Sequence, residues 1–423
     1  MFRMNRRQFG LLSAAGLLCP RPARAAVSAA ERRFLFIFCS GGWDTTFVFT
    51  PLGDSPDVDT EPRATTATGG GIPFVDAASR PSVRRFFETW GDRSCLINGI
   101  EVQSITHERC RELILTGRSN LGGDDWPSIL GGRAPGAPNL PHLVLAGPAF
   151  TRDYTAQVVR IGDNGQLPAL LTGDALRDAN LPGAVPGPEV QALEEAFVRR
   201  QLLGQLDPAG GGQQQAFLRQ YAQALGDVEV LAENASQLSL EPRFPDCERD
   251  IVADAATAMD CFQLGLSRCA MTRYNGWCDE GWDTHQGLEL QDINFEDLFA
   301  YLGQIQEELA RRTGLSGRPL SEEVVTVVFS EMGRAPRYNA WLGKDHWTFT
   351  SALLIGGGVA GGRVIGAVDD HALGQPVDLA SGEVHTSGTR LLPEHLGATL
   401  LALGDVDPGD YTGGAEPIAA ALS

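Results

Sequence analysis

Basic residues are scarce in this chain. Its 423 residues include 34 Lys and Arg against 53 Asp and Glu, which gives a formal net charge of −19. Nucleic acids and anionic membranes attract positively charged surfaces, so this composition argues against both as partners. The acidic balance instead fits a soluble exported protein that collects cations.

Long apolar segments are lacking beyond the first residues. The N-terminus carries an Arg6-Arg7 pair, a short apolar run over 9–19 and the small-x-small sequence Ala23-Arg-Ala25. This order is typical of a signal peptide read by the twin-arginine translocase. We therefore predict that residues 1–25 are cleaved and that the mature protein is periplasmic or secreted. It has no second apolar span, so no stable membrane span is expected after cleavage.

Cysteines are few and none forms a Cys-x-x-Cys motif. Eight occur in the chain, and seven remain after the predicted cleavage, so at least one must be unpaired. Cys247, Cys261, Cys269 and Cys278 lie near one another in the sequence, where one disulfide could form in an oxidising compartment. Most of the others are expected to be buried thiols, with Cys39 in an apolar segment as the clearest example.

Internal repeats and low-complexity linkers are also absent, so we predict one domain over 26–423 with a helical or loop insertion at about 150–250. Short apolar runs alternate with helical patterns, which predicts an α/β fold with a mostly parallel central sheet in three layers. Strands are expected at 34–39, 95–100, 142–146, 324–329 and 352–355. Helices are expected at 81–90, 107–115, 190–203, 213–225, 251–266, 295–312 and 393–403.

Histidine occurs only seven times, yet two histidines stand beside aspartates in Gly/Trp-rich segments. These are Gly281-Trp-Asp-Thr-His285 and Gly343-Lys-Asp-His346. Two such Asp/His couples are what a pair of divalent metals needs. Imidazole with carboxylate favours zinc, and carboxylates alone suit calcium or magnesium. His385 is a third imidazole that could join them.

Other polar residues follow the expected strands, where the active groups of a parallel sheet belong. Asp44 follows the first strand and Glu331 the fourth. Ser104 and Thr106 follow the second strand and open a helix. Their hydroxyls are by default N-caps, but near a metal either could be activated as a nucleophile. Arg334 offers a planar donor for the oxygens of an anionic ester.

Taken in order, these segments resemble the exported family that carries the number 1501 among the domains of unknown function, which is similar to the alkaline phosphatase and sulfatase superfamily. The segments that carry the resemblance are Gly41-Gly-Trp-Asp44, Thr106-His107 with Thr116-Gly117, Gly281-Trp-Asp-Thr-His285, Ser330-Glu-Met-Gly-Arg334, Asp345-His346, Gly356 to Gly362 and Pro393 to Gly404. No Cys-x-Pro-x-Arg sulfatase signature is present, which argues against a formylglycine-dependent sulfatase.

The resemblance implies an alkaline-phosphatase-like fold and a hydrolase of phosphate or sulfate esters, acting on a small-molecule or glycan ester. It implies that Thr106, or alternatively Ser104, is the nucleophile. From its planar donor group we also expect Arg334 to hold a substrate oxygen. The resemblance places the metals on Asp44, Asp283, His285, Asp345, His346 and His385, with His107 supporting these ligands from behind. We also expect Glu331 to orient one of the metal ligands. The alternative is a non-catalytic exported binding or envelope-associated protein that retains the fold.

Overall fold

The computed structural model describes residues 27–53, 55–118, 122–161, 187–207, 210–238 and 247–423. The predicted signal peptide lies outside these residues. Within them, no helix combines the length and apolar character that crossing a membrane requires.

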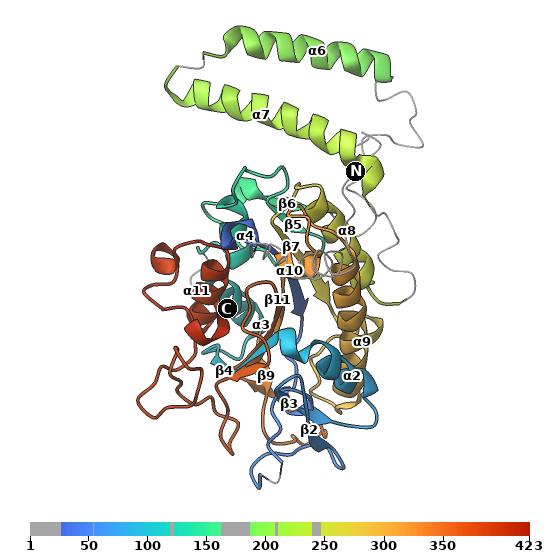
Figure 1. Ribbon diagram of the computed structural model, residues 1–423, viewed down its shortest axis with the longest axis vertical. Coiled ribbons are helices and arrows are strands. Elements are labelled where there is room, and N and C mark those ends of the chain that lie inside the picture. The colour runs from blue at the N-terminus through green and yellow to red at the C-terminus, as the bar shows by residue number, and fades with distance from the viewer. Residues whose placement is uncertain (1–26, 54, 119–121, 162–186, 208–209, 239–246) are drawn as a thin grey trace, which may run out of the picture.

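An eight-stranded sheet forms the centre of the molecule (Figure 1). In spatial order its strands are β12 (Arg363–Ile365), β4 (Ser94–Glu101), β11 (Phe349–Gly356), β8 (Val324–Ser330), β1 (Arg33–Cys39), β7 (Cys269–Tyr274), β5 (His142–Val144) and β6 (Val158–Arg160). Every pairing is parallel except those of β11, which runs antiparallel to β4 and β8. The predicted α/β class with a mostly parallel sheet is therefore confirmed.

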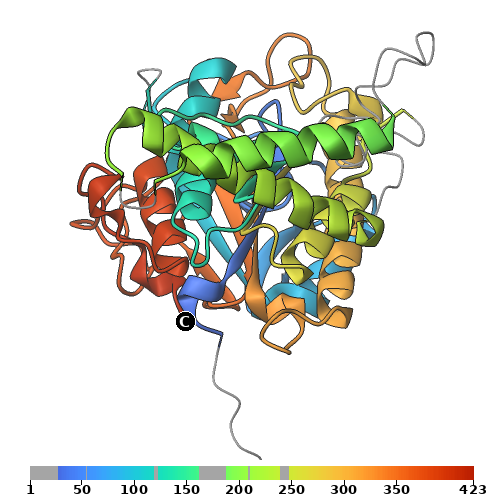
Figure 2. The same ribbon diagram turned by 90° about the horizontal axis from the view of Figure 1, so that it is seen from above.

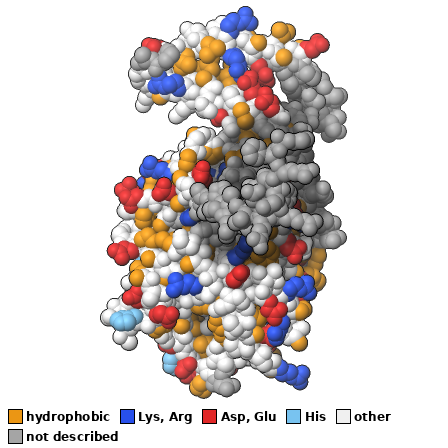
Figure 3. All heavy atoms as spheres, viewed as in Figure 1, with side chains coloured by type: hydrophobic (Ala, Val, Ile, Leu, Met, Phe, Trp, Pro, Cys, Tyr) orange, Lys and Arg blue, Asp and Glu red, His pale blue; other side chains and the backbone are white. Residues whose placement is uncertain are grey.

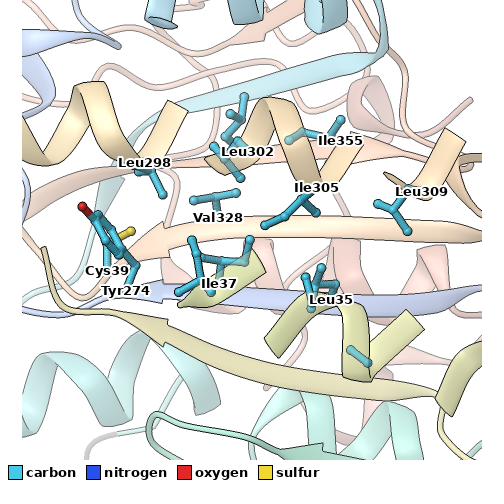
Figure 4. Close-up of a cluster of buried hydrophobic side chains, with 14 of the residues drawn as sticks. Leu35, Ile37, Cys39, Tyr274, Leu298, Leu302, Ile305, Leu309, Val328 and Ile355 are labelled. Atoms are coloured by element: carbon cyan, nitrogen blue, oxygen red, sulfur yellow. The ribbon is translucent and has the colours of Figure 1, made fainter. Parts of the chain in front are cut away.

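Helices cover both faces of the sheet, and β1 shows why. Phe34, Phe36 and Phe38 point to one face and pack in a cluster with side chains from α3 (His107–Thr116), α4 (Trp126–Gly132) and α11 (Pro393–Leu403). Leu35 and Ile37 alternate with them and point to the opposite face. There they pack against α2 (Pro81–Trp90), α8 (Ile251–Gln263) and α9 (Glu289–Arg311), as Figure 4 shows for α9. A continuous apolar run is thus buried on both faces, because each alternate residue has its own helical layer.

Part of the predicted insertion is an exposed helix pair. Helices α6 (Pro188–Gln205) and α7 (Gln213–Asn234) lie side by side across one end of the molecule (Figures 1 and 2), and Arg199 and Glu229 form an ion pair between them. Several large apolar side chains of this pair are exposed, and Figure 3 shows hydrophobic atoms on its surface. The most exposed are Leu193, Phe197, Leu203 and Phe217.

One disulfide forms in the predicted cysteine group. It joins Cys247 to Cys278 and links the chain before α8 to the segment after β7. Five other cysteines, including Cys39, are buried thiols. Burial raises the pKa of the Cys39 thiol well above its usual range, which keeps it protonated and unreactive. Both expectations about the cysteines agree with the structure.

Candidate metal centre

Four parallel strands end at the same edge of the sheet, and the loops beyond them supply the site. The loop after β1 contains Gly41 to Asp44, and the segment after β4 leads to His107 at the start of α3. Asp283 follows β7, and Glu331 follows β8. Because these strands are parallel, side chains far apart in the sequence converge at their carboxyl ends.

His107, Asp283 and His346 form the one group among the described residues whose potential metal ligands all lie within 4.8 Å of one another. The His107 Nε2 atom lies 3.3 Å from Asp283 Oδ2, and His346 Nε2 lies 3.1 Å from Asp283 Oδ1. His285 joins from one side, with its Nε2 atom 3.2 Å from Asp283 Oδ1 and 3.0 Å from His346 Nε2. Three imidazoles therefore direct the same ring nitrogen toward one carboxylate.

The other ring nitrogen of each histidine is held by an oxygen acceptor. His346 Nδ1 donates to the carbonyl of Ile105 at 2.7 Å. His107 Nδ1 lies 2.9 Å from the carboxylate of Glu331, and His285 Nδ1 lies 3.0 Å from that of Asp345. A protein that binds a metal through Nε2 commonly fixes its histidines in this way, because the acceptor sets the tautomer and the ring orientation.

The donor set fits a zinc ion. With Nδ1 protonated, each Nε2 atom carries a lone pair. The Nε2 atoms lie 3.1 to 3.3 Å from the Asp283 oxygens, and those of His285 and His346 lie 3.0 Å apart, so these contacts would be repulsive without a proton or cation among them. Tetrahedral zinc with bonds of about 2.0 to 2.1 Å separates its ligand atoms by about 3.3 Å. The spacing observed here is close to that value. The imidazole nitrogens favour zinc, because calcium and magnesium prefer sites built from oxygen ligands alone.

The electrostatics of the group agree with a cation site. Hydrogen bonds to Asp283 and Glu331 raise the pKa of His107 to about 9, against the opposing effect of burial. Partial burial would raise the pKa of Asp283, but hydrogen bonds from His107, His346 and Arg334 outweigh it and hold that pKa below its usual range. In the protein without metal, a proton on His107 thus balances the Asp283 carboxylate. A metal cation would replace that proton.

Arg334 supports Asp283 from behind. Its side chain is fully buried and donates to Asp283 Oδ1 at 2.6 Å and to the carbonyls of Gly42 and Lys344. Its nitrogens are thus engaged by the protein. The sequence predicts that Arg334 holds a substrate oxygen, whereas in this structure its guanidinium group orients Asp283.

Glu331 is held as firmly as Arg334. Its two carboxylate oxygens accept from the backbone N–H of Gly41 at 2.9 and 3.1 Å, and Oε2 also accepts from the Ser330 hydroxyl. The side chain is fully buried and contacts His107. Glu331 therefore lies behind the His107 ring and ties that ring to the loop after β1.

The glycines and tryptophans of the motifs shape the loops. Gly41 has φ +124°, and a Cβ atom there would lie 2.7 Å from the backbone nitrogen of Asp283. Only glycine lets these two loops pack together. Trp43 and Trp282 are fully buried, and their indole N–H groups donate to Thr350 and Tyr274. They anchor the loops in the core.

Asp345 and His285 are fixed by a turn. Asn339 donates through its side-chain amide to the His285 carbonyl at 2.9 Å and to Asp345 Oδ1 at 3.1 Å. A Cβ atom on Gly343 would lie 2.3 Å from the His285 carbonyl oxygen, so this turn too needs glycine. Asp345 contacts His285 through Nδ1, on the side away from Asp283, and so acts on the ring's orientation.

Asp44 and His385, both implied as metal ligands, lie outside the group of His107, Asp283 and His346. Asp44 is fully buried and forms an ion pair with Lys344 at 2.8 Å. His385 is exposed in the loop between β12 and α11, where its Nδ1 atom contacts Ser387 at 3.0 Å.

Thr106 lies between two residues that touch the cluster. The Ile105 carbonyl accepts from His346, and His107 belongs to the cluster itself. Thr106 occupies the N-cap position of α3 but makes no side-chain capping hydrogen bond, and it is exposed. Ser104 Oγ accepts from the backbone N–H of Thr106 at 3.2 Å. The hydroxyl of Thr106 is therefore not used in capping, whereas that of Ser104 has a structural contact.

His107 is the member of the cluster whose place sequence reasoning missed, since the resemblance put it behind the ligands. One feature of the sequence could have indicated that His107 belongs to the cluster, namely its position as the first residue of a helix that follows a buried strand. Its distance in sequence from Asp283 and His346 concealed the contact.

Fold and site together define a three-layer α/β protein with a cluster of His107, Asp283 and His346 at the carboxyl edge of its sheet. The chain belongs to the family described as "Protein of unknown function (DUF1501)", whose model matches residues 31–391. That membership was predicted and is confirmed. None of the curated proteins matches the chain.

Several solved structures show a remote likeness to this chain. Ps i-CgsB in complex with k-i-k-neocarrahexaose is 10% identical with a TM-score of 0.41, covering 92% of this chain and 75% of its own. The PsFucS1 sulfatase from Pseudoalteromonas sp. is 13% identical with a TM-score of 0.35, covering 100% and 77%. The phosphoethanolamine transferase EptA from Neisseria meningitidis is 11% identical with a TM-score of 0.33, covering 91% and 56%.

Proposed function

We propose that this protein is an exported, zinc-dependent hydrolase of phosphate or sulfate esters. The observation that carries the proposal is the convergence of three histidine Nε2 atoms on Asp283, each ring being held at Nδ1 by an oxygen acceptor. Such a cluster is partly exposed, so an ester oxygen could reach it. A zinc ion bound there would act as a Lewis acid on that oxygen and favour ionisation of a nearby hydroxyl.

Thr106 is the nucleophile that the arrangement favours. Its hydroxyl is exposed, makes no capping bond and stands at the N-terminus of a ten-residue helix, where the helix dipole favours negative charge. Its neighbours on both sides contact the cluster. In this proposal the Thr106 hydroxyl loses its proton to solvent, and its oxygen forms a bond to phosphorus or sulfur while the bond to the leaving oxygen breaks. The leaving oxygen takes a proton from solvent and departs as an alcohol. Water then attacks the same phosphorus or sulfur atom, breaks its bond to the Thr106 oxygen and restores the hydroxyl.

The remaining residues position the reacting groups. Glu331 and Asp345 orient His107 and His285, and Arg334 holds Asp283. Because Arg334 is buried, the negative charge of the substrate would be stabilised by the metal and by the backbone N–H groups of the first turn of α3. Small-molecule or glycan esters are the proposed substrates, and the twin-arginine translocase is the proposed partner during export.

The test is turnover by the mature protein, purified after export and loaded with zinc, on aryl phosphate monoesters, phosphodiesters and aryl sulfates. We expect hydrolysis of at least one class, its loss on chelation and its recovery when zinc is returned. A fully metallated protein that hydrolyses none of these classes would contradict the proposal and favour the non-catalytic binding protein.

A further inference from the structure

Lys344 is the only lysine among the 423 residues, and it is buried inside the site. Its Nζ atom lies 2.8 Å from Asp44 Oδ2, and neither side chain is exposed to solvent at all. Two fully buried charges of opposite sign are costly to maintain unless each compensates the other. The pair at this position therefore requires that Lys344 and Asp44 compensate each other's charge.

The polar partners of both groups are supplied by the protein. The ammonium group of Lys344 also donates to Thr46 Oγ1 at 3.1 Å and lies 5.7 Å from the centre of the Tyr338 ring. Asp44 Oδ1 accepts from the Thr46 N–H and hydroxyl at 3.0 and 2.7 Å. Asp44 Oδ1 thus accepts two hydrogen bonds, while Oδ2 has the ion pair with Lys344 as its contact.

The pair is coupled to the cluster through the backbone. The Lys344 carbonyl accepts from Arg334, which holds Asp283, and the Lys344 N–H donates to the carbonyl of Thr284. Asp44 lies on the loop after β1, whose Gly41 touches the backbone of Asp283. Lys344 therefore places its positive charge beside Asp44. Without this lysine, the Asp44 carboxylate would be available to bind a second cation.

We propose that the site takes one divalent metal, at His107, Asp283 and His346, and that the ammonium group of Lys344 takes the place of a second cation against Asp44. Asp44 is then a partner of Lys344 and no metal ligand. This inference deepens the proposed function and shares its metal site, but it makes its own claim about stoichiometry. It replaces the pair of metals that the two Asp/His couples predict.

The first test counts metal in zinc-loaded, dialysed protein by inductively coupled plasma mass spectrometry. We expect one equivalent in the wild type and in the double variant Asp44→Asn/Lys344→Met, which has neither buried charge, with zinc affinity changed by less than about threefold in the double variant. His346→Ala, the matched control, should lose the metal. Two equivalents in the wild type, or loss of zinc from a folded double variant, would overturn the inference. Each tenfold loss in affinity corresponds to about 1.4 kcal/mol, so ligand and non-ligand are easily separated.

The second test uses Asp44→Asn, Lys344→Met and the double variant, because either single change leaves an unpaired buried charge and could prevent folding. We expect lower unfolding midpoints for both single variants and recovery in the double variant, which has neither charge. A double variant no more stable than the singles would contradict the pairing.

The outcomes separate this inference from the proposed function. One equivalent of zinc without turnover would reject the proposed hydrolase and support the single-metal inference. Two equivalents with turnover would support the hydrolase and reject the single-metal inference. A protein that binds no metal would reject both.

Discussion

The substitution Thr106→Ala separates a nucleophile from a helix cap. Replacing a capping Ser or Thr by Ala usually costs about 0.5 to 2 kcal/mol of stability. Thr106 makes no capping hydrogen bond and is exposed, so we expect the free energy of unfolding to change by less than about 0.5 kcal/mol. Loss of a nucleophile, in contrast, should reduce kcat about a thousandfold or more, equivalent to about 4 kcal/mol in the barrier.

Ser104→Ala is the matched control, two residues away in the same loop. Ser104 Oγ accepts from the Thr106 N–H, so its removal should cost about 0.5 to 1.5 kcal/mol of stability while kcat changes little. The assay is chemical denaturation beside initial rates on whichever ester class the wild type hydrolyses. An active Thr106→Ala protein would refute the assignment, and a large loss of rate in Ser104→Ala would transfer the role to Ser104.

Three further predictions follow from the disulfide, the cluster and the N-terminus. Replacing Cys247 and Cys278 by Ser should lower the free energy of unfolding by about 3.5 kcal/mol, because the bridge closes a loop of 31 residues; an unchanged denaturation midpoint would contradict this. The pKa of His107 is raised to about 9, so its proton competes with zinc, and the apparent affinity for zinc should fall about tenfold per pH unit from pH 9 to 7. Competition with a zinc-binding dye at several pH values would measure this, and an affinity independent of pH would contradict the assignment of His107 as a zinc ligand. Changing Arg6 and Arg7 to Lys should leave the precursor in the cytoplasm, as fractionation and immunoblotting would reveal, whereas normal export would rule out the twin-arginine route.

The local sequence determined most of the elements. The apolar run over 34–39 predicted β1, and the structure places that strand in the middle of the sheet. Each of the expected helices is present, several with nearly the predicted bounds, such as α2 and α11. Periodic patterns of this kind are local properties, so they can be recognised without knowledge of the fold.

Strand β7 escaped prediction although it lies next to β1. Its sequence contains Thr272 and Arg273, which interrupt the apolar run on which the other strands were recognised. The buried Thr272 finds a partner in Asp254 of α8, a contact that only the folded chain provides. Likewise, the antiparallel direction of β11 depends on the path of the preceding loop and on pairing with β4 and β8.

The sequence by itself determined which residue types the site could use, since Asp283, His285, Asp345 and His346 stand out in Gly/Trp-rich segments. Only the tertiary structure decided what each one does. It brought His107 into contact with Asp283 across 176 positions and turned Asp345 toward the back of His285. It also paired Asp44 with the buried Lys344. The physical reason is that a ligand is defined by where its lone pair points, and that direction is set by long-range hydrogen bonds and packing.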